Sequence, residues 1–172
     1  MGAVKIKGKT KLMCMTGLFT ALVFVVTAYL HIPTVNGYVH VGDGVIYLAA
    51  CILPTPCAVF VGATGALLAD CLTGFAIWAP GSVIIKALGA LLFSSKSKKI
   101  ITLRNLLALF PATVICIGGY YLYEALIFWN FISPISGLLA SLTQSVASAL
   151  LFVVVGLSID KTNFKSKWNR GI

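Results

Sequence analysis

The sequence predicts an all-α integral membrane protein, a bundle of six transmembrane helices with its N and C termini in the cytoplasm. The 172 residues are 59% hydrophobic and only 10% charged, whereas soluble domains carry about 25% charged residues. The mean hydropathy is +1.01. At about 20 residues per crossing, this length has room for about six helices. We therefore expect a single membrane domain, residues 1–172, without a separate soluble domain.

The basic residues fall into three groups, and their placement predicts the topology. There are 13 Lys and Arg residues against 4 Asp and Glu residues, which gives a net charge of +9. The groups lie before the first apolar run (5–11), between two later runs (96–104) and after the last run (161–170). Basic groups of this kind mark cytoplasmic flanks. No basic-groove motif accompanies them, so we do not expect nucleic-acid binding.

The apolar runs define the expected helices. Pro33 and the Pro54-Thr55-Pro56 segment break the pattern between runs, because proline cannot continue a helix. The run 12–30 is longer than a signal-peptide core and no clear cleavage site follows it, so we interpret it as a retained helix. The six predicted helices are 12–30, 43–53, 57–73, 82–93, 106–128 and 134–159.

The first helix, 12–30, carries Gly17 and Ala21 four residues apart, a spacing that lets another helix approach closely. The next segment, 31–42, is polar and contains Asn36-Gly37, a turn signal. On the predicted topology it is a loop outside the cell. Its Tyr38 and His40 are candidates for ligand contact, although tyrosine is also common at the membrane boundary.

Ionisable residues within apolar runs are expensive in lipid and mark candidate functional positions. Asp43 begins the helix 43–53, where a carboxylate caps backbone N–H groups or contacts a ligand; the two roles are compatible. Asp70 lies near the outer end of the helix 57–73, and Lys86 lies one turn into the helix 82–93. We expect either an Asp70–Lys86 ion pair or a Lys86 side chain that reaches to the outer surface.

The last two helices add further polar groups. Tyr120, Tyr121 and Glu124 cluster toward the outer end of the helix 106–128, and Glu124 shares a face with each tyrosine. Gln144 belongs to a polar stripe with three serines, which either joins helices by hydrogen bonds or lines a pocket. The nine predicted ligand-binding residues are Tyr38, His40, Asp43, Asp70, Lys86, Tyr120, Tyr121, Glu124 and Gln144.

The five cysteines show no CxxC spacing, and we expect them to act as packing residues. We predict no metal and no cofactor. The sequence has no Walker A, GxSxG or HExxH motif, so we do not expect an enzyme. Two alternatives stay open: a small membrane enzyme using Asp70, Lys86 or Glu124 as acid or base, and an assembly protein whose polar residues only join helices.

Several short motifs occur in a fixed order along the chain: Ile32-Pro33, Gly37 through Asp43, Gly65-Ala66 with Ala69-Asp70, Gly74, and Ala79-Pro80-Gly81 with Ile85-Lys86. With the six predicted helices and the basic N-terminus, this order resembles the substrate-binding S components of energy-coupling factor (ECF) vitamin transporters. Within that superfamily, it looks most like the group of S components whose assigned ligands include riboflavin and pyrimidine or pyridine vitamin precursors.

The resemblance implies a function. S components bind a vitamin or related micronutrient in a pocket that opens to the outside and is capped by the loop after the first helix. A membrane coupling subunit and two cytoplasmic ATPase subunits supply the energy, in a bacterial-type plasma membrane. The first helix docks on the coupling subunit through an alanine-rich motif, to which Gly17 and Ala21 correspond loosely.

Overall fold

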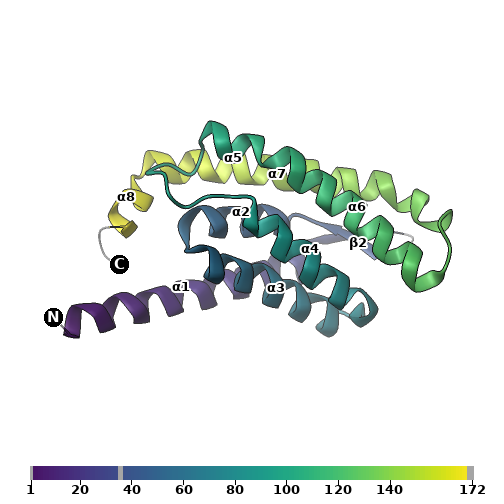
Figure 1. Cartoon of the computed structure of the whole chain (residues 1–172), viewed down its shortest axis with the longest axis horizontal. Helices are drawn as coiled ribbons and strands as arrows, with labels where there is room; N and C mark the ends of the chain where they lie inside the picture. The colour runs from purple at the N-terminus through teal and green to yellow at the C-terminus, as the bar shows by residue number, and fades with distance from the viewer. Residues whose placement is uncertain (1, 35–36, 170–172) are drawn as a thin grey trace.

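Helices make up most of the computed structural model, which describes residues 2–34 and 37–169 (Figure 1). The elements in chain order are α1 (Gly2–Tyr29), β1 (His31–Thr34), β2 (Gly37–His40), α2 (Gly42–Ile52), α3 (Thr55–Leu72), η1 (Ala76–Trp78), α4 (Ala79–Leu91), α5 (Leu103–Leu107), α6 (Leu109–Phe128), η2 (Ser133–Gly137), α7 (Leu138–Lys161) and α8 (Phe164–Asn169).

Four segments of the described chain are long and apolar enough to cross a membrane: Gly8–Tyr29, Thr55–Leu72, Leu103–Phe128 and Ser133–Lys161. Two shorter apolar helical segments, Gly42–Ile52 and Ala76–Leu91, accompany them. Each of the six predicted helices therefore has a counterpart. The predicted helix 106–128 differs in one respect: it is broken at Ala108 into α5 and α6, and α5 begins where the Thr102 side chain accepts a hydrogen bond from Asn105 N.

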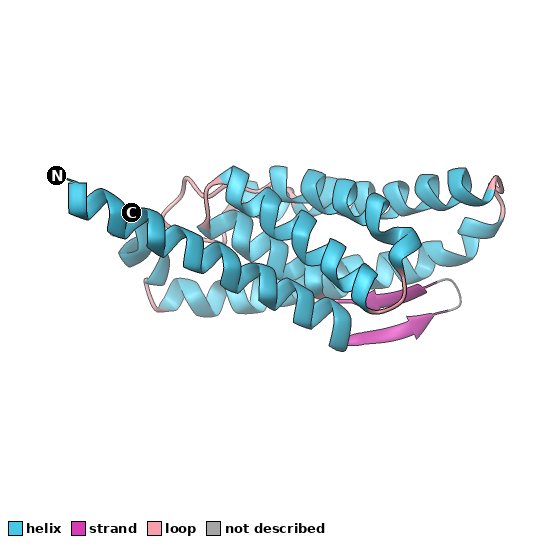
Figure 2. Cartoon of the chain, turned by 90° about the horizontal axis from the view of Figure 1, so that it is seen from below, coloured by secondary structure: helices cyan, strands magenta, loops and turns pink. Residues whose placement is uncertain are grey.

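The segment predicted as a polar loop contains a β-hairpin, so the expectation of an all-α chain needs a correction. Strands β1 and β2 pair antiparallel, with His31 opposite His40 and Ile32 opposite Val39. Pro33 fits because both strands are edge strands, where a missing N–H is tolerated. Asn36 of the predicted turn lies outside the described residues. Figure 2 shows the hairpin at one end of the bundle.

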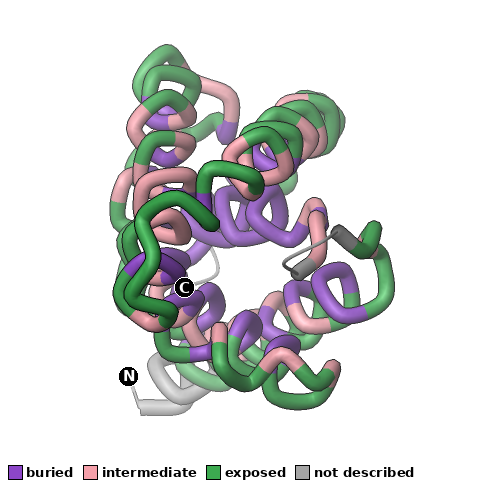
Figure 3. The backbone as a smooth tube through the Cα atoms, turned by 90° about the vertical axis from the view of Figure 1, so that its right-hand side faces the viewer, coloured by how far each residue is buried: buried purple, intermediate pink, exposed green. Residues whose placement is uncertain are grey.

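Helix α2 forms the centre of the bundle. All its residues are buried, and it contacts α1, α3, α4 and α7. Its Tyr47 stacks on Phe93 with ring centroids 4.4 Å apart, and Phe152 packs against both rings. A Cβ on Gly44 would lie 2.6 Å from the backbone oxygen of Ser148, so glycine is needed where α2 meets α7. Figure 3 shows the buried positions gathered inside the bundle.

The outer surface of the bundle is apolar. Large hydrophobic side chains are exposed along the long helices, including Leu18 of α1, Leu126 of α6 and Leu150 of α7. A soluble domain would bury such side chains, whereas a lipid-facing helix presents them outward. The bundle is therefore a multi-pass membrane protein.

The bundle has two chemically different ends. The start of α1 and helix α8 lie toward the same end of the bundle in Figure 1. There Asp160 of α7 accepts hydrogen bonds from Ile100 N (2.7 Å) and Ile101 N (2.9 Å), and Lys165 Nζ donates to the Lys99 carbonyl (3.2 Å). We call this the basic end, because the loop 96–104 and α8 meet there. The opposite end carries β1 and β2, and we call it the hairpin end.

Candidate ligand-binding site

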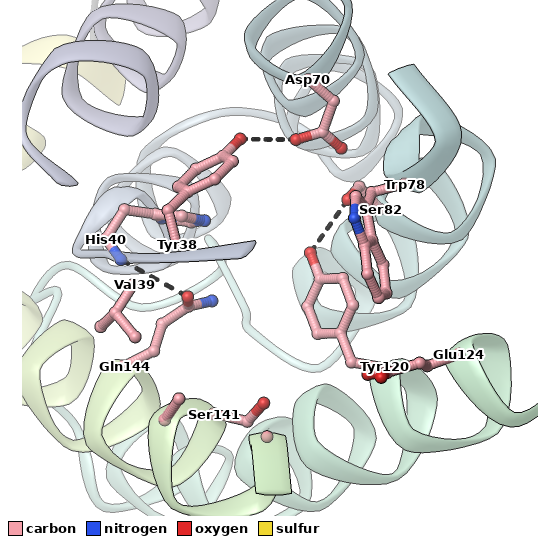
Figure 4. Close-up of a pocket in the computed structure, with 12 residues that line it drawn as sticks. Tyr38, Val39, His40, Asp70, Trp78, Ser82, Tyr120, Glu124, Ser141 and Gln144 are labelled. Carbon is pink, nitrogen blue, oxygen red and sulfur yellow. Dashed lines mark hydrogen bonds between the residues drawn. The ribbon is translucent and has the colours of Figure 1, made fainter. Parts of the chain in front are cut away.

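A pocket lies at the hairpin end, between β2 and the helices α3, α4, α6 and α7 (Figure 4). Its cavity volume is about 90 Å³, and it is partly open to solvent. Its lining combines aromatic rings, small residues and polar groups: Tyr38, Val39, His40, Asp70, Trp78, Ser82, Tyr120, Glu124, Gly137, Ala140, Ser141 and Gln144.

Tyr38 ties the hairpin to α3. Its hydroxyl donates to Asp70 Oδ1 at 2.6 Å, and its ring contacts His31 and Phe75 with centroids 4.9 Å and 4.8 Å apart. Burial, together with the neighbouring Asp70 carboxylate, raises the pKa of Tyr38 well above its ordinary value. The hydroxyl therefore keeps its proton and remains a donor.

Asp70 lies in the last turn of α3 and is only 5% exposed. Its second oxygen, Oδ2, is buried and has no hydrogen-bond partner among the described residues. A buried polar atom without a partner is costly and needs an explanation. Asp70 lines the pocket, and the Ser82 hydroxyl also interacts with its carboxyl group; contact of Asp70 with a ligand stays a prediction.

The opposite wall is aromatic and hydroxylated. Ser82 Oγ and Tyr120 Oη lie 3.0 Å apart and share a hydrogen bond. Trp78 contacts Tyr120 edge to face, with centroids 6.4 Å apart. Glu124 lies one turn further along α6 and is 7% exposed. Figure 4 shows Trp78 and Tyr120 together across the pocket from Tyr38.

His40 and Gln144 join the hairpin to α7. The backbone N–H of His40 donates to Gln144 Oε1 at 3.4 Å, and Gly42 N donates to His40 Nδ1 at 3.1 Å. Burial lowers the pKa of His40 to about 4. The imidazole is therefore neutral at pH 7, as its role as an acceptor at Nδ1 requires.

Asp43 and Lys86 lie beneath this pocket rather than in its lining. Lys86 Nζ is 2.7 Å from Asp43 Oδ1, and both side chains are buried. The predicted Asp70–Lys86 pair is therefore wrong: Lys86 faces the central helix α2 and meets Asp43 there. Asp43 lies in the first turn of α2, as predicted, but its Oδ2 accepts hydrogen bonds from Lys86 Nζ and Gln144 Nε2.

Two contacts connect this ion pair with the pocket. Gln144 Nε2 donates to Asp43 Oδ2 at 3.0 Å. Lys86 Nζ lies 4.9 Å from the centroid of the Tyr120 ring. Since Gln144 and Tyr120 both line the pocket, Asp43 and Lys86 support its walls from below and do not face its interior.

The structure therefore divides the predicted ligand-binding residues. Asp43 and Lys86 form the pair below the pocket, and Tyr121 lies outside its lining, with its hydroxyl donating to the Phe131 carbonyl at 2.9 Å. The predicted residues that line the pocket are Tyr38, His40, Asp70, Tyr120, Glu124 and Gln144. Whether they contact ligand stays a prediction.

Sequence reasoning missed half of the lining: Val39, Trp78, Ser82, Gly137, Ala140 and Ser141. Two of these carried a usable signal. Ser82 lies one turn before Lys86, and Ser141 lies three residues before Gln144, so helical periodicity alone puts each beside a predicted residue. Trp78 carried none, because tryptophan in a connecting segment is also typical of the membrane boundary.

The predicted docking residues Gly17 and Ala21 lie on α1, a helix that contributes no residue to the pocket lining. Both are exposed, and a Cβ on Gly17 would meet nothing within 4 Å. Their role in docking stays a prediction. Within residues 2–34 and 37–169, no three His, Cys, Asp or Glu side chains gather closely enough to hold a metal ion.

A partly enclosed aromatic and polar pocket inside an apolar helical bundle defines a membrane protein that binds a small molecule. The family model described as "ECF-type riboflavin transporter, S component" matches residues 7–161, and the chain belongs to this family. The resemblance seen in the sequence is thereby confirmed. The chain is a vitamin-binding transporter subunit and not an enzyme. No curated protein matches the chain.

Proposed function

We propose that this chain captures riboflavin, or a related pyrimidine or pyridine micronutrient, from outside a bacterial plasma membrane. In this proposal all six apolar helical segments span the bilayer, with both termini in the cytoplasm. The ligand is then passed on through a membrane coupling subunit and two cytoplasmic ATPases. The single observation that carries the proposal is the pocket at the hairpin end.

The pocket chemistry suits a flat heteroaromatic ligand. Trp78 and Tyr120 form one aromatic wall and Tyr38 lies opposite, so a planar ring has aromatic surface on two sides. Ser82, Ser141 and Gln144 supply neutral donors and acceptors around it. Few precisely placed polar groups among aromatic side chains are typical of cofactor and vitamin pockets.

The charge distribution supports capture from outside. The loop 96–104 and α8 are basic and lie together at one end, and basic segments favour the cytoplasm. The pocket lies at the opposite end, under β2, whose Tyr38, Val39 and His40 all line it. The hairpin therefore covers part of the pocket on its outer side.

The first experiment is to purify the chain in detergent, denature it and identify any released small molecule by mass spectrometry. Binding of riboflavin and of pyridine and pyrimidine vitamins to ligand-free protein is then measured by calorimetry. We expect a heteroaromatic compound in the first measurement and binding of at least one panel member in the second. The proposal is contradicted if folded protein releases no heteroaromatic compound and binds no member of the vitamin panel.

Two adjacent tyrosines provide a matched control. Tyr120→Leu removes an aromatic wall of the pocket and should weaken binding by about tenfold or more, which corresponds to about 1.4 kcal/mol. Tyr121→Leu removes the same side chain one position later, outside the lining, and should leave affinity within about twofold. Equal effects of the two substitutions would place the ligand elsewhere.

A further inference from the structure

We propose that Asp70 anchors the ligand through an N–H group, so that the pocket accepts neutral or cationic heteroaromatic compounds and discriminates against anionic ones. This inference rests on the proposed function and specifies its substrate class. It concerns the residue that sets the charge preference of the pocket, which the match to a family of riboflavin transporter subunits does not address.

The first support is the Asp70 carboxyl group, whose two oxygens differ in their hydrogen bonds. Oδ1 accepts the Tyr38 hydroxyl at 2.6 Å, whereas Oδ2 is buried and has no hydrogen-bond partner in the described part of the chain. Figure 4 shows this side chain reaching from α3 toward the space between Tyr38 and Ser82. A buried carboxylate is costly unless it is paired. Besides the Ser82 hydroxyl, which interacts with this carboxyl group, an N–H donor from a ligand could pair with Oδ2.

The charge inventory of the pocket is the second support. Its lining contains two carboxylates, Asp70 and Glu124, and no lysine or arginine among the described residues. His40, the imidazole in the lining, is neutral at pH 7 because burial lowers its pKa to about 4. An anionic ligand would meet the Asp70 carboxyl group, and no lysine or arginine among the described residues lines the pocket to offset it.

Lys86 does not change this inventory. Its ammonium group is the nearest buried cation, but it lies 2.7 Å from Asp43 Oδ1 and the two charges offset each other. The pair also lies below the pocket lining. Lys86 also acts on Asp70 through space, but its pairing with Asp43 weakens that effect. Coulomb interactions strengthen where water is scarce, so the Asp70 carboxylate influences the charge that the pocket accepts.

The aromatic lining favours the same charge. The rings of Tyr38, Trp78 and Tyr120 line the pocket that Asp70 also lines (Figure 4), and Lys86 Nζ already lies 4.9 Å from the Tyr120 centroid. Aromatic faces attract cations, and tryptophan does so most strongly. A cationic ring can therefore place an N–H at Asp70 with its positive charge near Trp78.

The test compares ligands that share a ring and differ in charge. The first series, from most positive to most negative, is pyridoxamine, pyridoxine and 4-pyridoxate. The second series is thiamine and thiamine monophosphate, and the third is riboflavin and riboflavin 5′-phosphate. Affinities for the purified chain are measured by calorimetry. In any series that binds, we expect the more positive member to bind about tenfold tighter than the more negative one.

Asp70→Asn, which keeps the shape of the side chain, should reduce this ratio by about tenfold. Ser141→Ala, in the same lining but neutral, should weaken all members alike and preserve the ratio. If Asp70→Asn does not fold, Tyr38→Phe gives a second measurement: it frees Asp70 Oδ1, and the preference for the cation should rise.

Failure of this inference differs from failure of the proposed function. An anionic member that binds as tightly as its partner overturns the charge preference while vitamin binding stands. A ratio that survives Asp70→Asn, or a cation preference that does not rise in Tyr38→Phe, overturns the role of Asp70. Folded wild-type protein that binds no member of any series contradicts the proposed function, and this inference falls with it.

Discussion

Lys86 of α4 and Asp43 of α2 form an ion pair in the interior of the bundle, with 2.7 Å between Lys86 Nζ and Asp43 Oδ1. The side chains are 4% and 3% exposed. Through Gln144 and Tyr120, the pair contacts two walls of the ligand pocket. It therefore links the buried helix α2 to the helices that surround the site.

Removing one member of this pair should destabilise the bundle strongly. Lys86→Met or Asp43→Asn leaves a buried charge without its partner, which costs about 3–5 kcal/mol. The double variant should lose less than the sum of the single variants, because no unpaired charge remains. Unfolding in detergent micelles measures these differences. Lys96→Met, in the exposed loop at the basic end, is the control, and additive losses would contradict the coupling.

Acid should weaken the hairpin end through His40. Its pKa is about 4 in the folded chain, against an ordinary value of 6.5. Between these values the unfolded chain binds more protons, so stability is greatest above pH 6.5 and falls as the pH drops toward 4. The loss is at most about 3 kcal/mol.

The measurement compares melting temperatures at pH 7.5 and pH 4.5 for the wild type and His40→Asn. Asparagine can offer an acceptor to Gly42 N, as His40 Nδ1 does, but it does not titrate. We expect the variant to lose less stability than the wild type on acidification. The same loss in both proteins would show that other groups cause the acid sensitivity.

Two glycines of the α1–α3 region should respond differently to alanine. A Cβ on Gly65 would lie 2.6 Å from Val23 Cγ1, whereas a Cβ on Gly17 meets nothing within 4 Å. Gly65→Ala should therefore cost about 1–3 kcal/mol by overpacking. Gly17→Ala should be neutral or gain up to about 1 kcal/mol from helix propensity. Thermal unfolding of both variants checks this, and equal effects would contradict the α1–α3 packing.

Asn105 should hold the loop at the basic end. It is fully buried; its Nδ2 donates to the carbonyls of Ser94 (3.2 Å) and Ile100 (2.9 Å), and its Oδ1 accepts from Ser94 N (3.1 Å). Asn105→Leu leaves these backbone groups without partners, at about 1–3 kcal/mol each. Trypsin should then cleave the loop 96–104 faster, while Thr143→Ala, on an exposed face of α7, should leave the cleavage rate unchanged.

Much of the fold could be predicted from the sequence, because the lipid environment imposes simple rules. A helix that satisfies its own backbone needs a long apolar run, and such runs are visible in the composition. The ordered motifs around Tyr38, Asp70 and Lys86 were enough to recognise the family, which the match over residues 7–161 confirms. Six of the nine predicted ligand-binding residues also line the pocket.

The hairpin was missed because short strands have a weak local signal, and Pro33 argued against a strand. The pair Asp43–Lys86 was missed for a different reason. Sequence distance put Lys86 near Asp70 across one connecting loop, but a side chain's partner depends on which face of its helix meets which neighbour. Only the packing of α2 inside the bundle settles that choice.

The sequence by itself determined that this protein is helical, lies in a membrane and belongs to a family of vitamin-binding transporter subunits, since composition and ordered motifs encode these properties locally. The tertiary structure decided which polar residues share a pocket and which pair beneath it. Those relationships join residues far apart in the chain, such as Asp43 with Gln144 and Tyr38 with Asp70. They follow from helix packing, which local sequence patterns do not specify.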